Sequence, residues 1–311
     1  MQHDWISWGN YSAFGHSLNR KNDGSVEYSM YRYQLPGIAL DSPKELPSFA
    51  AFATQEIGRT PTIILSEAED LLEDRKALFA AHHKEMNISV LEEGWQFSLP
   101  QLPQIALRLT KDRSQILSTP WDANWKTSAM LPLLRTALEC ASAPSGVISL
   151  HAACVEKDGE AICFSAPSGV GKSTRAMQWI ETLGATFVSG DRPSICLDGD
   201  GVLACGAPWD GKEGIYRNVQ VPLKMICSIV RDDTVSVRRL SRSQARQFLL
   251  QQAFLPMWDT DATVAVMAVL HRLYDRVPVV ELRCGPDAEA ARAAYEWIYH
   301  HPERILEEAE Q

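Results

Sequence analysis

The sequence predicts a mixed α/β fold, with a small α+β domain over residues 1–125 followed by an α/β nucleotide-binding domain over residues 126–311. Two observations predict this fold class. Short apolar runs alternate with segments of helical spacing through the second half of the chain. In addition, the stretch SAPSGVGKST at 165–174 directly follows a short apolar run and precedes a helical segment. A glycine-rich turn between a strand and a helix is typical of α/β phosphate-binding cores.

Composition narrows the class of protein. The 311 residues are 45% hydrophobic and 22% charged, which predicts a packed globular core. The formal net charge is −9, and no dense Lys/Arg block is present, which argues against nucleic acid as the main partner. The seven cysteines never form C-x-x-C and lie in apolar segments, as expected for reduced thiols. Neither a signal peptide nor an apolar run of 18 residues is visible, so we expect a cytoplasmic protein with no membrane partner.

The first domain is expected to be mostly β structure. Residues 1–60 carry short aromatic segments interrupted by prolines, which favours irregular strands. The later segments are a strand at 61–66, a helix over 67–86, and hairpins over 87–99 and 104–118. The histidine pair in AAHHKE is interpreted as a solvated face of that helix, because no second ligand pair with zinc spacing is present. The segment PWDANWKTS at 120–128 is the expected boundary.

The second domain is expected to start with a largely buried helix from 127, followed by a hairpin with strands at 147–155 and 160–165. The helix after SAPSGVGKST should end at Gly184 as a C-cap, and a strand at 185–189 should follow. The tail alternates further strands (SICLD, MICSIV, VPVVELR) with helices (RSQARQFLLQQAFL, ATVAVMAVLHRLY, DAEAARAAYEWIYH).

The motif itself matches the P-loop pattern G-x-x-x-x-G-K-[ST] except that Ala166 replaces its first glycine. Gly169 and Gly171 permit the backbone conformations that turn N–H groups toward phosphate oxygens. Lys172 would contact the β- and γ-phosphates, and the Ser173 hydroxyl would bind Mg²⁺. An ordinary glycine-rich turn is the alternative. The predicted nucleotide-binding residues are Ser168, Gly169, Val170, Gly171, Lys172, Ser173 and Thr174.

Three further residues are candidates for catalysis. Asp191 ends the next strand, where it could hold Mg²⁺ together with Ser173; the alternative is a loop-capping aspartate. His151 lies in the strand before the P-loop strand and is either a catalytic group or a satisfied core histidine. Lys212, in the loop GAPWDGKEGIYRN, could neutralise charge on a transferring phosphoryl group, or it could be an ordinary solvated charge. Asp198 and Asp200 are expected to form a hairpin turn.

Taken together, HAAC with His151, SAPSGVGKST, FVSGDRPSI with Asp191 and GAPWDGKEG with Lys212 resemble the HPr serine kinase family. The resemblance is to its HPr-kinase-like branch and covers about residues 145–285, with a weaker extension into the first half. It implies the P-loop core shared with ATP-dependent phosphoenolpyruvate carboxykinase, and ATP·Mg²⁺-dependent phosphorylation of a serine hydroxyl. It also implies that Asp191 accepts the hydroxyl proton, helped by His151, and that copies of the chain tend to assemble.

The sequence departs from that family in two places. Gly190 stands where relatives with kinase and phosphorylase activity have the first of two aspartates, and the C-terminal phosphorolysis signature is missing. Both departures argue against the reverse reaction and against HPr as the substrate. Relatives in this branch modify serine in ribosomally made peptide precursors such as lasso peptides, so a protein or peptide is the expected acceptor. A small-molecule kinase and a nucleotide-binding regulatory module without turnover are the alternatives.

Overall fold

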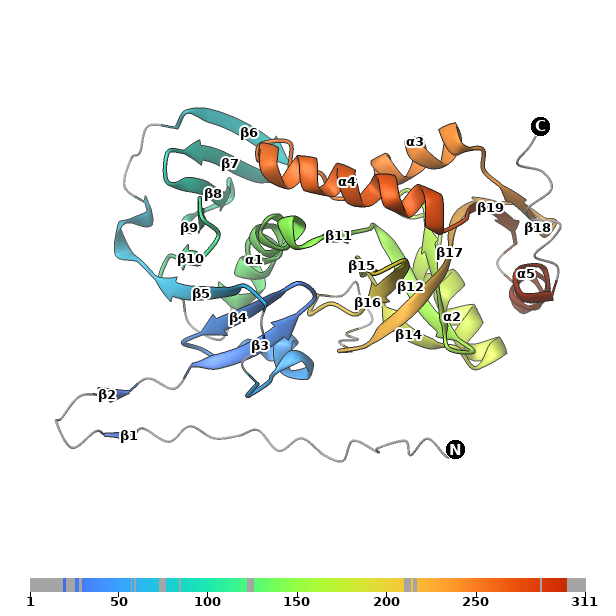
Figure 1. Ribbon diagram of the computed structural model, residues 1–311, viewed down its shortest axis with the longest axis horizontal. Helices are drawn as coiled ribbons and strands as arrows, with labels where there is room; N and C mark the ends of the chain where they lie inside the picture. The colour runs from blue at the N-terminus through green and yellow to red at the C-terminus, as the bar shows by residue number, and fades with distance from the viewer. Residues whose placement is uncertain are drawn as a thin grey trace.

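The computed structural model describes residues 19–20, 26–27, 30–56, 58, 60–72, 77–83, 85–121, 126–209, 214, 217–285 and 287–300. In this part of the chain two large sheets with attached helices lie side by side (Figure 1). The mixed α/β class predicted from the sequence is confirmed. Among the described residues, no helix is both long enough and apolar enough to cross a membrane.

The first sheet has the strand order β3-β4-β5-β10-β9-β8-β7-β6 in the described residues. β4, β5 and β10 run parallel, and the other neighbours are antiparallel. The strands are β3 (Tyr31–Leu35), β4 (Ile38–Ser42), β5 (Thr62–Glu67), β6 (Phe79–His83), β7 (Met86–Leu91), β8 (Gly94–Leu99), β9 (Leu102–Thr110) and β10 (Gln115–Ser118). A separate short pair joins β1 (Asn19–Arg20) to β2 (Val26–Glu27).

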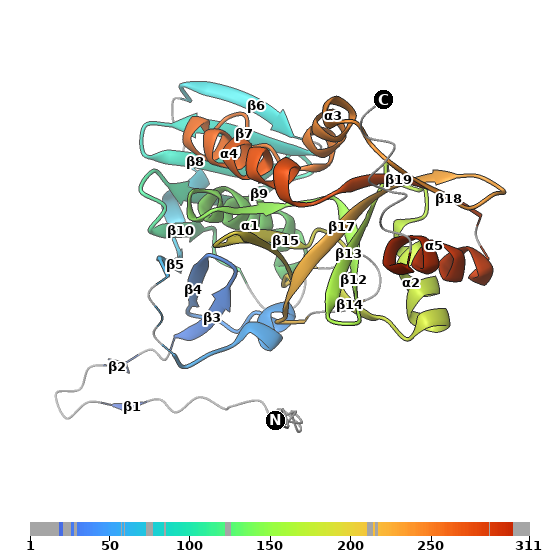
Figure 2. The ribbon, with the colours of Figure 1, turned by 45° about the vertical axis from the view of Figure 1, so that its right-hand side comes forward.

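Helix α1 (Lys126–Ser142) fills the concave side of this sheet (Figures 1 and 2). Its apolar side chains, among them Leu133, Leu134 and Leu138, are buried in one core with those of the strands. The 3₁₀ helix η1 (Pro47–Phe52) adds Phe49 and Phe52 to the same core. The first sheet is therefore closed by a helix that follows it in sequence.

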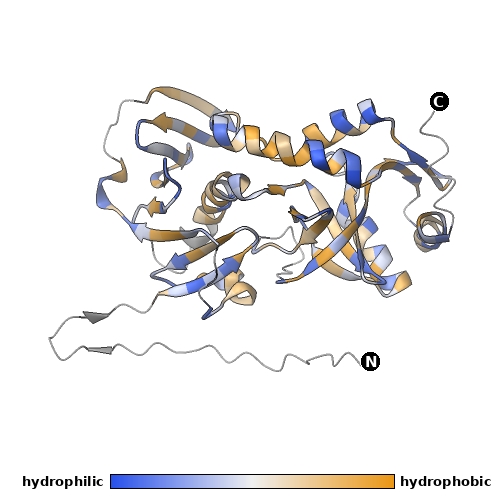
Figure 3. Ribbon diagram, viewed as in Figure 1, coloured by the Kyte–Doolittle hydropathy of each residue, from blue (hydrophilic) through white to orange (hydrophobic). Residues whose placement is uncertain are grey.

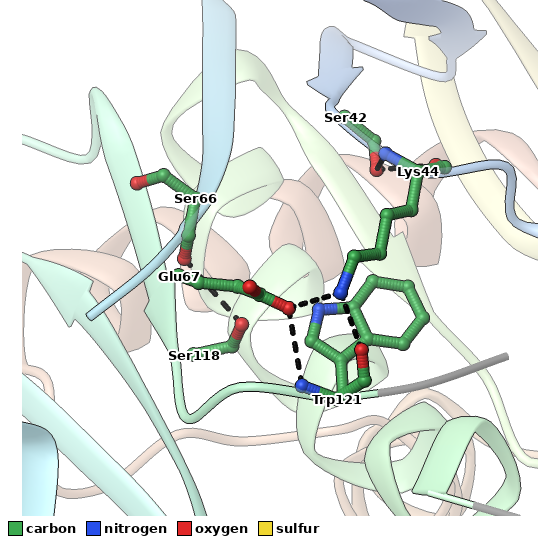
Figure 4. Close-up of polar contacts among 6 residues, drawn as sticks. All are labelled: Ser42, Lys44, Ser66, Glu67, Ser118 and Trp121. Carbon is green, nitrogen blue, oxygen red and sulfur yellow. Dashed lines mark hydrogen bonds and ion pairs between the residues drawn. The ribbon is translucent and has the colours of Figure 1, made fainter. Parts of the chain in front are cut away.

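A polar cluster fixes the chain where it leaves the first sheet (Figure 4). Lys44, just after β4, pairs with the Glu67 carboxylate and donates to the Trp121 carbonyl, and its ammonium lies 5.3 Å from the Trp121 ring centroid. The Trp121 N–H donates to Glu67 Oε1 at 3.1 Å, and Ser118 Oγ donates to the Ser66 carbonyl at 3.4 Å. These bonds join the ends of β4, β5 and β10 close to the start of α1.

The second sheet has the order β11-β15-β16-β17-β13-β12-β14, with β19 and β18 added beyond β17 in the described residues. β13, β17 and β19 run parallel. The strands are β11 (Val147–Ser149), β12 (Ala152–Lys157), β13 (Glu160–Ser165), β14 (Thr186–Ser189), β15 (Ser194–Asp198), β16 (Gly201–Cys205), β17 (Gln220–Arg231), β18 (Ser236–Arg239) and β19 (Val279–Cys284). The predicted turn at Asp198–Asp200 joins β15 to β16.

Helices cover both faces of this sheet. α2 (Lys172–Leu183) and α5 (Ala288–His300) pack on one face around Trp179. α3 (Arg242–Gln252) and α4 (Thr260–Arg276) pack on the other face. The short 3₁₀ helix η3 (Ala143–Ser145) contributes Ala143 to the same core. Figure 3 shows the hydrophobic residues concentrated on these central strands and on α4. Because helices cover both faces of the second sheet, its central strands are apolar on both sides, as expected for parallel strands.

The two halves meet at a buried ion pair. Both carboxylate oxygens of Asp259, which caps α4, lie 2.8 Å from Arg113 Nη2 in the turn between β9 and β10. Asp259 is 1% exposed. Next to this pair, Trp95 Nε1 donates to the Trp258 carbonyl at 3.2 Å, and the His83 ring lies edge-on to that of Trp258.

The predicted helix over 67–86 is wrong. The described residues of this stretch form the 3₁₀ turn η2 (Glu69–Leu72) and then β6, which pairs with β7 along its length. Pairing with a neighbouring strand outweighs the helical preference of this segment. The histidine pair therefore lies on an edge strand rather than a helix face, and His83 packs against aromatic rings.

Candidate functional site

The loop 166–171, here called the glycine loop, connects β13 to the first turn of α2. Gly169 has φ +81° and Gly171 has φ +118°, which is backbone that favours glycine over residues with a Cβ. The loop turns at Pro167–Gly169 and delivers the chain to Gly171, the N-cap of α2. The free N–H groups at the start of a helix attract anions, so this loop has the geometry of an anion-binding turn.

Ala166, which replaces the first glycine of the pattern, is fully buried in the core between the second sheet and α2. Its methyl group is therefore accommodated by packing. The side chain of Lys172 folds back over the loop, and Nζ donates to the Ala166 carbonyl at 3.2 Å. Burial lowers the pKa of Lys172; the nearby Asp191 carboxylate acts in the opposite direction, and the Arg192 guanidinium lowers the pKa further. Lys172 is thus a partly desolvated cation beside Asp191 and Arg192.

A cavity of about 710 Å³ adjoins the glycine loop, on the side toward the ends of β17 and β19. Arg231 at the end of β17 donates from Nε to the Val170 carbonyl at 3.0 Å and from Nη2 to the Gly169 carbonyl at 2.7 Å. Arg175, 4% exposed, donates to the Gly285 carbonyl, but its Nε and Nη1 have no hydrogen-bond partner among the described residues. Arg231 therefore holds the loop, and the lining of the cavity combines these two arginines with Asp232 and Asp233.

Asp191 stands in the turn that follows β14, and this turn is fixed on several sides. Ser189 Oγ donates to the Asp191 carbonyl at 2.8 Å, and the Arg192 N–H donates to the Ala152 carbonyl at 3.1 Å. Arg192 has φ +54°, a conformation uncommon for a residue with a side chain. Both the Asp191 carboxylate and the Arg192 guanidinium act on the pKa of Lys172, and the roles of Asp191 in metal binding and catalysis stay predictions.

His151 lies at a break between β11 and β12, where the sequence predicts one continuous strand. The break occurs because β11 pairs with β15, whereas β12 pairs with β13 and β14. The His151 N–H donates to the Gln252 carbonyl at 2.8 Å, and the His151 carbonyl accepts from Ser165 Oγ at 2.7 Å. Its backbone thus belongs to the floor of the site, next to the end of β13.

Lys212 lies outside the described residues, so its role stays a prediction. The ends of its loop are described. A Cβ built on Gly206 would lie 1.7 Å from the Arg217 carbonyl oxygen, so the two ends of the loop approach at a position that only glycine permits. Trp209 Nε1 donates to the Arg192 carbonyl at 3.1 Å. The loop therefore begins against the turn that carries Asp191.

A second cavity, of about 310 Å³, lies between the two sheets. Its walls come from the ends of strands of the first sheet, from α1, from Arg192 and from Phe254. The charged side chains in it are Arg135 and Glu139 on α1, Arg192 on the Asp191 turn and the exposed Glu85 before β7. The Glu139 carboxylate lies 3.9 Å from Arg192 Nη1. We call it the inter-sheet cavity.

Arg135, Glu139 and Arg192 were not predicted. The first two left a signal in the sequence, because they are the charges at spacing i, i+4 in the otherwise apolar helix SAMLPLLRTALECASA. Arg231 left no comparable signal. Its role depends on parallel pairing of β13 with β17, which are about sixty residues apart.

No group of three or more His, Cys, Asp or Glu side chains able to hold a metal occurs within the described ranges. A magnesium ion carried by a nucleotide needs fewer protein ligands, because phosphate and water oxygens supply the others. Ser173, in the first turn of α2, and Asp191 offer a hydroxyl and a carboxylate, which are the hard oxygen ligands that Mg²⁺ prefers. The donor set fits that ion.

No family model and no curated protein sequence matches the chain. Among solved structures, the chain is similar to the Hpr(Ser) kinase/phosphatase from Coxiella burnetii. The match has a TM-score of 0.30 and 10% sequence identity, and covers 51% of this chain and 98% of that chain. At this level of similarity the assignments that follow depend on the geometry of the site itself.

Proposed function

We propose that this protein is an ATP-dependent kinase that transfers the γ-phosphoryl group to a serine hydroxyl. The observation that carries the proposal is the glycine loop with Lys172 folded over it and Asp191 beside Lys172. Loop N–H groups, the N-terminus of α2 and a lysine make up the phosphate-binding part of a P-loop. The arrangement supports a P-loop core rather than an ordinary turn, because an ordinary turn has no need of a half-buried lysine.

In this proposal ATP lies with its phosphates on residues 168–174 and its nucleoside in the cavity of about 710 Å³. Arg175 lines this cavity, and its Nε and Nη1 have no hydrogen-bond partner among the described residues, so its guanidinium suits an anionic ligand. Ser173 and Asp191 would hold Mg²⁺, which neutralises phosphate charge when bound. Lys172 stabilises the charge on the transferring group.

The transfer itself needs one protein base. The serine oxygen forms a bond to the γ-phosphorus, the bond from that phosphorus to the β,γ-bridging oxygen breaks, and ADP leaves. The hydroxyl proton passes to the Asp191 carboxylate, which the turn after β14 holds beside Lys172. The His151 imidazole and Lys212 are proposed to assist, as the sequence predicted.

The test is phosphoryl transfer from γ-labelled ATP to serine-bearing acceptors. Lys172→Ala should lower the rate about 10²–10³-fold and Asp191→Asn about 10²–10⁴-fold, with unfolding temperatures close to that of the wild type. Lys111→Ala in the turn after β9 and Asp198→Asn at the end of β15, both exposed, are the matched controls and should keep full activity. If ATP binds and no acceptor is phosphorylated, the protein is a nucleotide-binding module without turnover. If Asp191→Asn keeps normal turnover, another group is the base.

A further inference from the structure

Two charged residues that line the inter-sheet cavity, Glu139 and Arg135, each have a buried side-chain atom without a hydrogen bond in the described part of the protein. Glu139 Oε1 has no hydrogen-bond partner there, although the Glu139 side chain is 4% exposed. Arg192 Nη1 lies 3.9 Å from Glu139 Oε1, which is too long for a hydrogen bond. Arg135 Nε, one helical turn away, is also buried without a partner among those residues. Buried charges without partners are costly, so a protein keeps them where a ligand completes them.

The position of the cavity connects it to the phosphoryl-transfer site. Arg192 lines the cavity and directly follows Asp191, and both residues act on the pKa of Lys172. The φ of +54° at Arg192 is backbone strain of the kind that clusters at functional sites. A molecule bound in the cavity would thus lie next to the proposed base.

The chemistry of the lining selects the ligand. Glu139 requires a donor, preferably a cation, and Arg135 with Arg192 requires an anion. Met86, Leu99 and Phe254 provide apolar walls, which strengthen both interactions by excluding water. A volume of about 310 Å³ is at the lower end for small-molecule sites, so it fits a compact ligand better than an extended peptide.

We infer that the inter-sheet cavity binds a free hydroxy amino acid as the phosphoryl acceptor. The ligand ammonium pairs with Glu139, its carboxylate pairs with Arg135, and its hydroxyl points past Arg192 toward Asp191. The inference rests on the proposed kinase function for the transfer step, in which the amino acid hydroxyl loses its proton to Asp191 and gains the γ-phosphoryl group of ATP. Binding of the amino acid itself does not depend on transfer.

The experiment measures binding by calorimetry on the full chain without nucleotide. The probes are L-serine, L-threonine and L-homoserine, together with two analogues that each lack one charge. 3-Hydroxypropionate has no ammonium, and serinol has no carboxylate. N-acetyl-L-serine amide, which lacks both charges, represents a serine inside a peptide. We expect at least one of the three free amino acids to bind the wild type and Lys172→Ala equally well, and the amide not to bind.

Two variants assign the contacts. Glu139→Gln should weaken binding of the amino acid at least about 30-fold and leave 3-hydroxypropionate unchanged, because only the ammonium partner is lost. Arg135→Gln should weaken binding of the amino acid by a similar factor and leave the affinity for serinol unchanged, because only the carboxylate partner is lost. This crossed pattern separates a direct contact from a variant that merely folds poorly, since misfolding would weaken every probe alike.

Several results would overturn the inference. The first is that none of the three amino acids binds at 10 mM, which is about ten times a 1 mM dissociation constant. The second is that the amide binds as tightly as the free amino acids. The third is that Glu139→Gln loses affinity for every probe alike. Phosphorylation of a serine peptide without binding of any free amino acid would overturn it too, yet leave the kinase function standing. Binding of a free amino acid without any transfer would support the cavity as the binding site, but it would overturn both the acceptor role and the proposed kinase function.

Discussion

The cavity at the glycine loop and the inter-sheet cavity differ in how their charged groups are partnered. At the glycine loop, Arg231 is bonded to the Val170 and Gly169 carbonyls, and Asp232 accepts from Thr234 and pairs with Arg283. In the inter-sheet cavity, Glu139 Oε1 and Arg135 Nε lack hydrogen bonds within the described chain. At the first cavity, the unpartnered atoms are the Arg175 nitrogens Nε and Nη1, and the Asp232 carboxylate is already bonded. The inter-sheet cavity therefore differs in leaving a carboxylate atom unpartnered as well as a guanidinium atom.

This difference follows from how each cavity is built. The glycine loop belongs to one sheet and one helix, so backbone N–H groups and a few local bonds fix it. The inter-sheet cavity has walls from both halves of the molecule, and it depends on how those halves meet. Disturbing the contact between the halves should therefore affect the second cavity far more than the first.

Asp259→Ala gives the largest expected effect on that contact. It removes the buried partner of Arg113 and the cap of α4, so we expect unfolding free energy to fall by about 3 kcal/mol or more. Binding of the amino acid should weaken, because Phe254 and His83, which line the cavity, pack beside Trp258. ATP affinity should stay within twofold of wild type (about 0.4 kcal/mol). The measurements are denaturant unfolding and calorimetry with both ligands.

Asp259→Asn is the matched variant, because asparagine caps helices nearly as well as aspartate. It should be more stable than Asp259→Ala by about 1 kcal/mol. Burial raises the pKa of Asp259 although Arg113 acts in the opposite direction, so burying the ionised carboxylate is unfavourable. Replacing it with neutral asparagine should therefore destabilise the protein less than replacing it with alanine. Equal loss in the two variants would mean that the cap contributes nothing.

Arg231→Gln tests the other cavity. It removes the two bonds that hold the glycine loop, and we expect ATP affinity to fall about 3- to 10-fold, as for exposed charged hydrogen bonds of about 1 kcal/mol. Affinity for the amino acid should not change. Arg238→Gln, an exposed arginine on β18 that pairs with Glu281, is the control. A matching loss of both ligands in Arg231→Gln would show that the cavities are not independent.

The glycine loop was predictable because its signals are local. The turn is indicated by Gly169, Gly171 and Lys172, which lie within four residues of one another. Gly184 ends α2 with φ +67°, as expected of a C-cap. The hairpins of the first sheet and most strands and helices of the second also lie where the sequence places them. Each of these depends on residues close together in the chain, for which sequence patterns are most informative.

The inter-sheet cavity could not be predicted, because no local pattern says that α1 will face Arg192. Its members come from β6, β7, β8, α1, the turn after β14 and the segment after α3, which meet only when the sheets are assembled. The helix predicted over 67–86 is wrong for the same reason, since β7 recruits residues 79–83 as a strand. The domain boundary near residue 125 stays a prediction, and the burial of α1 in the first core leads us to propose a boundary after that helix.

The smallest expected effect is a pH dependence that only the first cavity should show. Burial lowers the pKa of Lys172 below that of an ordinary lysine, and bound phosphates favour its charged form. ATP affinity should therefore decline as pH rises through the lowered pKa of the free protein, before ordinary lysines titrate. Lys172→Arg keeps its charge across this range and should show no such decline. Calorimetric titrations of both proteins with ATP between about pH 7 and pH 10 compare them directly. A decline of the same size in Lys172→Arg would assign the titration to another group, and an undiminished wild-type affinity would mean that the Lys172 charge does not contribute to binding.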